Sequence, residues 1–401
     1  MNSQARDFKV EDNVEALLDR VRALQPMIRQ HAAQGEKDRR VPDAVIEALK
    51  EAGAFKLGVP KRYGGYEGDM KAFLDLSSLV AEADGGTAWV TTLVNVCNFF
   101  VGYYPKAVQD QVFGANPGAL VSGVLTPTAE SRKVEGGYRV SGKWFYNSGG
   151  WHTDWAGLGI PVVDENGQVV DQGMALIPSS DLRIEDTWFV AGMAASGSIC
   201  LIAEDVFVPE ARVMSIPAAL EGEYPTELKD SEPVYRSALA PVFALVLVGP
   251  QLGLGRAALD FVKAKSPNKP ISYTYLTSQA DSVGFQLQIA EAAMMIETAH
   301  LHAYRAAANI DDAAREGIHP PKEMRARIRA DVGLVAEKIT GAIDILISAH
   351  GAGSFAQVSP LQRIWRDSNV AARHAIVGPK IAYEAYGKIL LGIKEQVTPL
   401  I

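Results

Sequence analysis

RKVEGGYRVSGKWFYNSG, residues 132–149, contains two short runs of alternating polar and apolar residues separated by the turn EGG. Alternation with a period of two is typical of a strand buried on one face, and a glycine turn between two such runs predicts a β-hairpin. Similar runs continue from about residue 119 to about residue 213, for example WAGLGIPVV and SICLIAEDVFVP. The sequence therefore predicts a compact antiparallel β segment, a sandwich or a barrel, in the middle of the chain.

Both flanks of this segment have helical periodicity. From about residue 10, VEALLDRVRALQPMIRQHAAQ spaces its apolar residues three and four apart, and RARIRADVGLVAEKITGAIDILISAHGAG does so near the C-terminus. We predict an α+β fold with an N-terminal helical domain (1–118), a central antiparallel β domain (119–214) and a C-terminal helical bundle (215–401). Long helices with broad apolar faces commonly pack against copies of themselves, so we expect a homo-oligomer.

Composition excludes several classes of function. The 401 residues carry a formal net charge of −8 and no long basic run, which argues against a nucleic-acid or membrane-surface partner. The two cysteines show no metal-ligand spacing, so we expect no metal and reduced thiols in a cytoplasmic protein. The polar, acidic N-terminus does not look like a secretory signal. The apolar run SALAPVFALVLVGPQLGLG is interrupted by Pro241 and Pro250, which favours a buried helix over a membrane span.

Five stretches together resemble the acyl-CoA dehydrogenase superfamily over nearly the whole chain. They are VPKRYGGYEGDMKAFLDLSSLVAEADGGTAWV (59–90), LVSGVLTPT (120–128), YRVSGKWFYNSGG (138–150), EDVFVPEARV (204–213) and LQRIWRDSNV (361–370). The resemblance implies a flavin at the edge of the β domain. A flavin ring needs apolar surfaces on its faces and hydrogen bonds along its edge.

The residues at the matching positions suit that need. Trp144 offers a face for the ring, and Ser148 can reach its reactive edge because Gly149 and Gly150 let the backbone approach closely. We expect cofactor contacts from Ser122, Thr126, Thr128, Trp144, Ser148, Ser196, His350, Gly351, Gly353 and Arg366.

One position separates dehydrogenases from oxygenases. Most of the family carries a catalytic glutamate about nine residues after the arginine of its R-D-A helix, and that count from Arg366 reaches Ala375. No carboxylate lies between Asp367 and Glu384, whereas His374 is present. The pattern W-R-D followed by this histidine resembles the two-component flavin-dependent monooxygenases of the superfamily. The stretch that holds a pyrophosphate-binding arginine in relatives is also missing, which favours FMN, with FAD as the alternative.

The resemblance implies that reduced FMN (or FADH2) reacts with O2 to a flavin hydroperoxide, which hydroxylates an aromatic or heteroaromatic, indole- or phenol-like substrate. A separate NAD(P)H:flavin reductase would supply the reduced flavin, and the oligomer would be a homotetramer. His374, Ser148 and Asn147 are the candidate catalytic residues, because the intermediate needs hydrogen-bond donors and protection from water.

Substrate contacts are expected from the helix LVNVCNFFVGYYP and the turn GGWHTDW. Related hydroxylases often carry a substrate-binding histidine in that helix, and this chain has none there, which favours an indole over a simple phenol. The candidates are Asn98, Phe99, Tyr103, Trp151 and His152. Three alternatives stay open: an acyl-CoA dehydrogenase with a displaced base, an N-oxygenase of an amino sugar, and an inactive scaffold.

Overall fold

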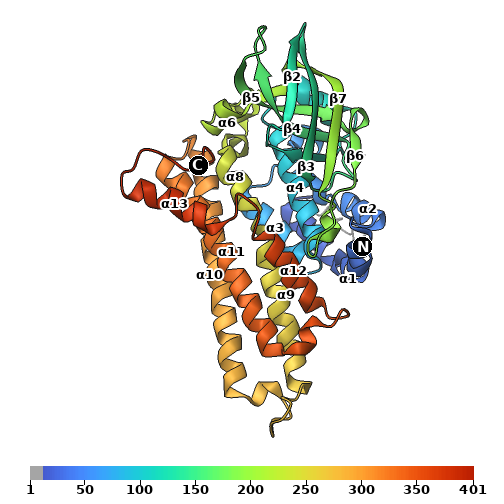
Figure 1. Ribbon diagram of the computed structural model, residues 1–401, viewed down its shortest axis with the longest axis vertical. Helices are drawn as coiled ribbons and strands as arrows, with labels where there is room; N and C mark the ends of the chain where they lie inside the picture. Colours follow the sequence, from blue (N-terminus) through green and yellow to red (C-terminus); the bar gives the residue numbers. More distant parts are fainter. Residues whose placement is uncertain (1–11) are drawn as a thin grey trace, which may run out of the picture.

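The computed structural model describes residues 12–401, with the strands gathered at one end of the molecule and the helices below them (Figure 1). The N-terminal part consists of α1 (Val14–Asp38), α2 (Asp43–Glu51), α3 (Met70–Ala81), α4 (Gly85–Val101) and the short α5 (Lys106–Gln109). The predicted helix start near residue 10 falls outside the described residues.

Side-chain caps fix where three of these helices begin. Asn13, Asp69 and Asp84 each accept a hydrogen bond from the backbone N–H three residues further on, at the first turns of α1, α3 and α4. Such caps satisfy backbone donors that have no partner inside the helix. Asp84 thereby sets the start of α4, a helix that packs against strand β1.

Two four-stranded sheets form the β domain. One sheet has the strand order β1-β4-β5-β8 and the other β2-β3-β7-β6. The strands are β1 (Val121–Val124), β2 (Ala129–Val134), β3 (Gly137–Asn147), β4 (Trp155–Val163), β5 (Val169–Pro178), β6 (Arg183–Glu185), β7 (Ile199–Pro209) and β8 (Val213–Ser215). The hairpin predicted from residues 132–149 is the β2–β3 pair, whose turn lies at 135–136.

The expectation of a purely antiparallel domain was wrong in one place. Strands β1 and β4 pair in parallel, with Gly123 opposite Gly157. Between them the chain crosses to the other sheet, forms the β2–β3 hairpin and returns running in its original direction. Because the β2–β3 hairpin lies between them, β1 and β4 run in the same direction. The alternation of residues within each strand does not reveal this direction.

The C-terminal part is again helical. It contains α6 (Ile216–Leu220), α7 (Leu228–Ser231), α8 (Leu239–Val246), α9 (Gly249–Lys265), α10 (Val283–Glu316), α11 (Lys322–His350), α12 (Pro360–Ala371) and α13 (Pro379–Leu390). The apolar run expected to form one buried helix forms two, α8 and α9. The stretch Leu239–Asn268 is long and apolar enough to cross a membrane, but 78% of its most apolar window is buried inside the fold, as in the core helices of globular proteins.

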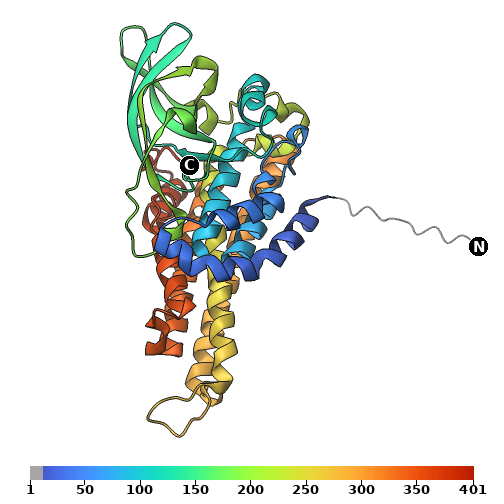
Figure 2. The same ribbon diagram turned by 90° about the vertical axis from the view of Figure 1, so that its right-hand side faces the viewer.

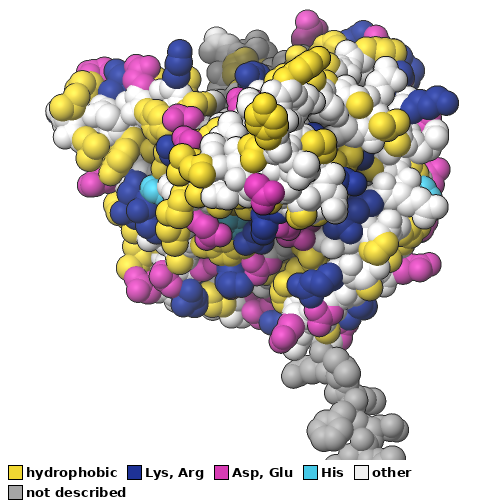
Figure 3. Space-filling view, turned by 90° about the horizontal axis from the view of Figure 1, so that it is seen from below, with side chains coloured by type: hydrophobic (Ala, Val, Ile, Leu, Met, Phe, Trp, Pro, Cys, Tyr) yellow, Lys and Arg dark blue, Asp and Glu magenta, His cyan; other side chains and the backbone are white. Residues whose placement is uncertain are grey.

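The two helical parts share one hydrophobic core. Side chains from α1, α3 and α4 belong to the same buried cluster as those from α8 to α11, whereas the β-sandwich has a separate core. Figure 2 shows α1 lying across the bundle while α9 and α10 project away from the β domain. At that projecting end, seen in Figure 3, acidic and basic side chains are interspersed with apolar ones. The β domain is thus seated on a single helical body, and the segments joining the two meet at their junction.

Candidate active site

A chain of hydroxyl groups lies where the β domain meets α4. The indole N–H of Trp89 donates to Ser148 Oγ (3.1 Å), which lies 2.7 Å from Ser198 Oγ. Ser198 Oγ in turn lies 2.8 Å from Ser196 Oγ, and the backbone N–H of Gly149 donates to the Ser196 carbonyl (2.9 Å). The predicted residues Ser148 and Ser196 therefore come together, through Ser198, which sequence reasoning missed.

The end of β3 is distorted just before Ser148. The pairing of β3 with β7 shifts register between Trp144 and Asn147, and Tyr146 has a positive φ of 66°. Such a bulge redirects the strand and costs backbone energy in a residue other than glycine. It turns Tyr146 outward, with 72% of its surface exposed, against the ring of Trp188 at 6.0 Å. These two aromatic rings were not among the predicted residues.

The prediction that Trp144 packs on a flavin ring was wrong. Its side chain is 0% exposed inside the sandwich core, and its indole N–H donates to the Gly159 carbonyl (2.8 Å). Because β3 alternates its faces until the bulge, Trp144 points inward. No surface of its ring is free for a ligand.

Asn147 is fully buried, and both polar atoms of its side chain have no hydrogen-bond partner among the described residues. Buried amides are almost always paired, so this amide, one residue before Ser148, is a candidate to bind a polar group of a ligand. A flavin fits this arrangement, because its ring edge carries both donors and acceptors. No group of three or more His, Cys, Asp or Glu side chains suited to a metal ion occurs in residues 12–401.

His374 lies in the turn that follows α12 and packs near Trp89, the residue that also bonds Ser148. Its ring centroid is 5.9 Å from that of Trp89 and 6.3 Å from that of Phe243. Burial among these groups lowers the pKa of His374 to about 4, so the imidazole is neutral at neutral pH. Its Nδ1 accepts a hydrogen bond from the Ile376 N–H (3.3 Å), which assigns the proton to Nε2 and makes Nε2–H a donor.

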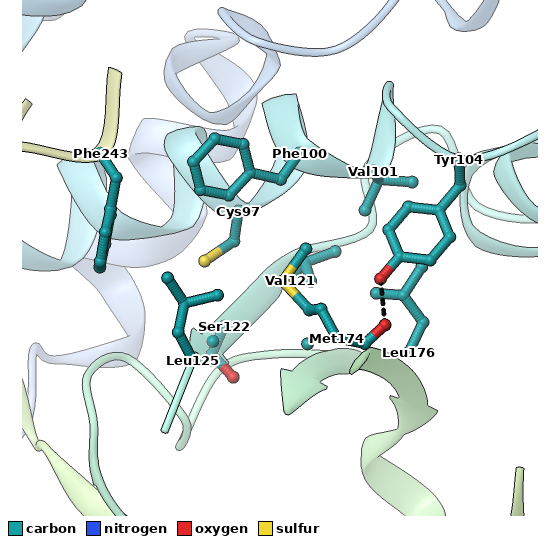
Figure 4. A pocket seen from close by; sticks show the side chains of 12 residues that line it. Cys97, Phe100, Val101, Tyr104, Val121, Ser122, Leu125, Met174, Leu176 and Phe243 are labelled. Atoms are coloured by element: carbon teal, nitrogen blue, oxygen red, sulfur yellow. Dashed lines mark hydrogen bonds between the residues drawn. The ribbon is translucent and has the colours of Figure 1, made fainter. Parts of the chain in front are cut away.

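An apolar pocket opens beside Phe243 (Figure 4). Its enclosed volume is about 20 Å³, close to the space that one water molecule needs, so an aromatic ring could enter only if side chains of the lining move. One wall is α4 and the other is formed by β1, β4 and β5. The lining residues are Cys97, Phe100, Val101, Tyr104, Val121, Ser122, Gly123, Leu125, Gly157, Met174, Leu176 and Phe243. None of them is charged, and Tyr104 donates its hydroxyl to the Met174 carbonyl (2.5 Å).

Ser122, predicted to contact the cofactor, lines this pocket instead. Its hydroxyl lies 3.1 Å from Thr153 Oγ1. Thr126 and Thr128 follow on an exposed loop, where the Thr128 hydroxyl donates to the Lys143 carbonyl (2.6 Å). Their contact with a cofactor stays a prediction.

The three substrate residues predicted on α4 lie on the wrong face of that helix. Asn98 is fully buried, and its amide bonds the Phe55 carbonyl (2.9 Å) and the Val121 N–H (3.0 Å). Phe99 and Tyr103 are 0% exposed inside an aromatic cluster. The pocket is lined by the neighbouring face, whose residues 97, 100, 101 and 104 follow the three- and four-residue spacing of a helix.

Trp151 and His152 also lie away from the pocket. A Cβ at Gly197 would sit 2.8 Å from the Trp151 ring, so this indole packs on the 197 turn. His152 Nδ1 lies 3.4 Å from a carboxylate oxygen of Asp43 at the start of α2, and burial lowers its pKa. Neither residue lines the pocket, and their role in substrate binding stays a prediction.

Two further cofactor predictions fall elsewhere. Arg366 forms an ion pair with Glu36 (2.5 Å) and bonds the Ala191 carbonyl, so its guanidinium holds α12 to α1 instead of facing the pocket. His350, Gly351 and Gly353 precede α12, whereas His374 follows it. A 12-residue helix is about 18 Å long, so the turn at His350 cannot contact the same flavin ring as His374 within one chain. Its contact with another part of a cofactor stays a prediction.

The comparisons with known proteins identify the family of the chain. Residues 11–109 match the family described as "Acyl-CoA dehydrogenase, N-terminal domain" and residues 245–379 its C-terminal domain. The chain is 33% identical to the flavin-dependent monooxygenase oxygenase subunit HsaA of Rhodococcus jostii, over 92% of this chain and 97% of that protein. It is 29% identical to the oxygenase component of p-hydroxyphenylacetate 3-hydroxylase from Acinetobacter baumannii, covering 96% and 90%.

The solved structure of XiaF from Streptomyces sp., in complex with FADH2 and glycerol, superposes with a TM-score of 0.92 at 37% identity. That match covers 96% of this chain and 97% of XiaF. The fold is thus that of the acyl-CoA dehydrogenases, as the sequence predicted. Within it, the chain belongs to the family of oxygenase components of flavin-dependent monooxygenases.

Sequence reasoning missed Trp89, Ser198 and Phe243. Trp89 belongs to the quoted motif GGTAWV, and Ser198 ends the turn GMAASGS. A tryptophan in the first turns of an apolar helix and a second serine two residues from a predicted one were the available signals. No such signal marked Phe243, because it lies in a uniformly apolar run.

Proposed function

We propose that the protein hydroxylates a small, neutral aromatic or heteroaromatic compound with O2 and a reduced flavin. The net reaction is ArH + reduced flavin + O2 → ArOH + oxidised flavin + H2O. The observation that carries the proposal is the neutral imidazole of His374 beside a pocket whose lining contains no carboxylate. An acyl-CoA dehydrogenase needs a carboxylate there as the base that removes a proton from its thioester substrate.

The bound flavin would supply the activation of O2 and the transfer of one oxygen atom. The chain's own residues have three tasks. Ser148 would hold the ring edge, and Asn147, whose amide is otherwise unpaired, would join it if the flavin uncovers this fully buried side chain. The imidazole of His374 offers an N–H donor and stays neutral near neutral pH. The apolar pocket excludes water, which otherwise promotes release of H2O2.

The pocket lining favours an indole-like substrate over a carboxylated phenol. It offers a thiol at Cys97 and the hydroxyls of Ser122 and Tyr104, both of which lie within hydrogen-bond distance of a protein atom. A carboxylate inside this wall would lose its hydration without gaining a cationic partner. A flat ring with one polar edge, turned toward His374, matches the lining. An amino sugar would leave its many hydroxyl groups unpaired, so the N-oxygenase alternative fits less well.

The flavin form, the partners and the assembly are part of this proposal. The FADH2 bound in the XiaF structure favours FADH2 over the FMN expected from the sequence. The names of the relatives, oxygenase subunit or component, support a separate NAD(P)H:flavin reductase. A homotetramer is supported by the exposed apolar stripe Val283, Leu287, Met294 and Leu301 along α10. The turn at His350 to Gly353 would then serve the flavin of another copy, and the free thiols suit a cytoplasmic protein.

The test mixes the purified protein with photoreduced FAD or FMN, indole and oxygenated buffer, and quantifies hydroxylated product and H2O2. We expect product from the wild type and a severe loss in a folded His374→Ala variant. Reduction of bound flavin by an acyl-CoA, with no product from any aromatic compound, would instead support the dehydrogenase alternative.

A further inference from the structure

We propose that Asp367 is a positioning residue that ties the two halves of the active site together. One half is the turn 192–198, which holds Ser148 through its serines. The other is α12, whose C-terminal end leads to His374. The proposal rests on the proposed function, because it assigns Asp367 an effect on how oxygen transfer is coupled.

The contacts form a continuous path. Asp367 Oδ1 accepts a hydrogen bond from the backbone N–H of Met193 at 2.6 Å. Met193 has a positive φ of 53° and begins the 3₁₀ turn Ala194–Ser196. Ser196 then reaches Ser148 through Ser198, by contacts of 2.8 Å and 2.7 Å. A single carboxylate on α12 thus holds the start of the turn whose last residue, Ser198, contacts Ser148.

Packing makes this path stiff. A Cβ at Gly192 would lie 2.5 Å from the Arg366 carbonyl oxygen, and one at Gly86 would lie 2.7 Å from the Cβ of Ala195. A Cβ at Gly35 of α1 would lie 3.4 Å from that same Ala195 atom. The turn therefore packs against α12 and α4 at distances that only glycine allows, and it makes an ordinary contact with α1. A shift of α12 would move the turn, and the serines with it.

The charges around Asp367 show that its carboxylate is retained at a cost. Burial first, and the neighbouring Asp84 second, raise the pKa of Asp367 to about 7, against the opposing effect of its hydrogen bond from Met193 and of two arginines. Burial also raises the pKa of Asp84. The charged side chains facing this pair are Arg363 and Arg366 of α12 and Glu36 of α1. A neutral side chain of the same shape would give the fold at least the same stability as Asp367 does.

The experiment compares Asp367→Ala, which removes the acceptor, with Asp367→Asn, which keeps an acceptor oxygen and removes the charge. Hydrogen exchange of residues 190–199 is measured first, in the flavin-free protein. The fraction of O2 consumption that appears as H2O2, and KM for the aromatic substrate, are then measured with reduced flavin. Asp311→Ala is the matched control, because Asp311 is also buried, also accepts a backbone N–H (Met70, 2.9 Å) and also has a pKa raised to about 7.

We expect Asp367→Ala to exchange faster at 190–199 and to release several-fold more H2O2 at an unchanged KM. Asp367→Asn should match the wild type in hydrogen exchange and in H2O2 release. Asp311→Ala should lower stability without affecting coupling. Wild-type coupling in folded Asp367→Ala, or an equal loss in Asp367→Asn, would overturn the proposal. If Asp367→Ala does not fold, Ser198→Ala cuts the same path, and wild-type coupling in that variant would overturn it too. Absence of product from the wild type would refute the proposed function, whereas the exchange result would still report on the path.

Discussion

Ser148 and His374 contact the same side chain, the indole of Trp89. The Trp89 N–H donates to Ser148 Oγ at 3.1 Å, and the Trp89 ring centroid lies 5.9 Å from that of His374. One ring on α4 thus fixes the relative positions of two residues that are 226 positions apart in the chain. Because Phe243 contacts His374 and lines the pocket, the same arrangement also connects the site to the place where a substrate would lie.

The shared indole predicts the effect of removing its N–H. Trp89→Phe keeps a ring against His374 but leaves Ser148 without this donor, so we expect more H2O2 and less product per O2 consumed. Trp144→Phe is the control, since its indole N–H is bonded to a carbonyl inside the sandwich core. It should lower the free energy of unfolding by about 1–3 kcal/mol and leave coupling unchanged. Equal losses of coupling in both variants would show that coupling does not depend on the Trp89–Ser148 hydrogen bond in particular.

The lowered pKa of His374 predicts a pH dependence of stability. The pKa is about 4 in the folded protein and about 6.5 in the unfolded chain. Between these values the unfolded state binds more protons, so stability falls as the pH is lowered from about 6.5 toward 4. Between pH 8 and pH 5 the wild type should lose about 2 kcal/mol more than His374→Gln, as measured by urea unfolding. Equal losses would mean that His374 is more solvated than the structure shows.

Gly123 and Gly157 face each other on β1 and β4 and line the pocket, so their lack of a side chain should affect which substrates fit. A Cβ at Gly157 would lie 3.5 Å from Met174 Sδ, an ordinary contact, and would fill part of the pocket floor. Gly157→Ala should therefore fold normally and raise KM for bicyclic substrates more than for single rings. Gly387→Ala, on α13 with no neighbour near its new methyl group, is the control. An unchanged preference between one-ring and two-ring substrates would place the substrate elsewhere.

Asn98 and Cys97, on adjacent faces of α4, should behave differently. Asn98→Ala leaves the Val121 N–H and the Phe55 carbonyl without their partner, at about 1–3 kcal/mol for each buried group. We expect a large loss of stability and little change in KM for the molecules that remain folded. Cys97→Ala should show the reverse, because Cys97 lines the pocket. A change in KM for Asn98→Ala alone would restore its predicted role in substrate binding.

The sequence predicted the layout of the fold, which follows from alternation, helical spacing and motif order. The family resemblance placed Ser148 and Ser196 at one site. The sequence did not predict which face of α4 lines the pocket, since a uniformly apolar helix has no polar face to orient it. The inward direction of Trp144 depends on where the β3 bulge begins, and nothing in WFYNSG marks that point. The ion pair of Arg366 with Glu36 depends on how α12 packs against α1, which is a property of the whole fold.

The most direct test of the account is a single turnover under ¹⁸O2 with reduced flavin and an indole-like substrate, followed by mass spectrometry of the product. We predict one ¹⁸O atom in each product molecule from the wild type, and almost no labelled product from folded His374→Ala. Product that carries oxygen from water, or full labelled product without the imidazole, would contradict it.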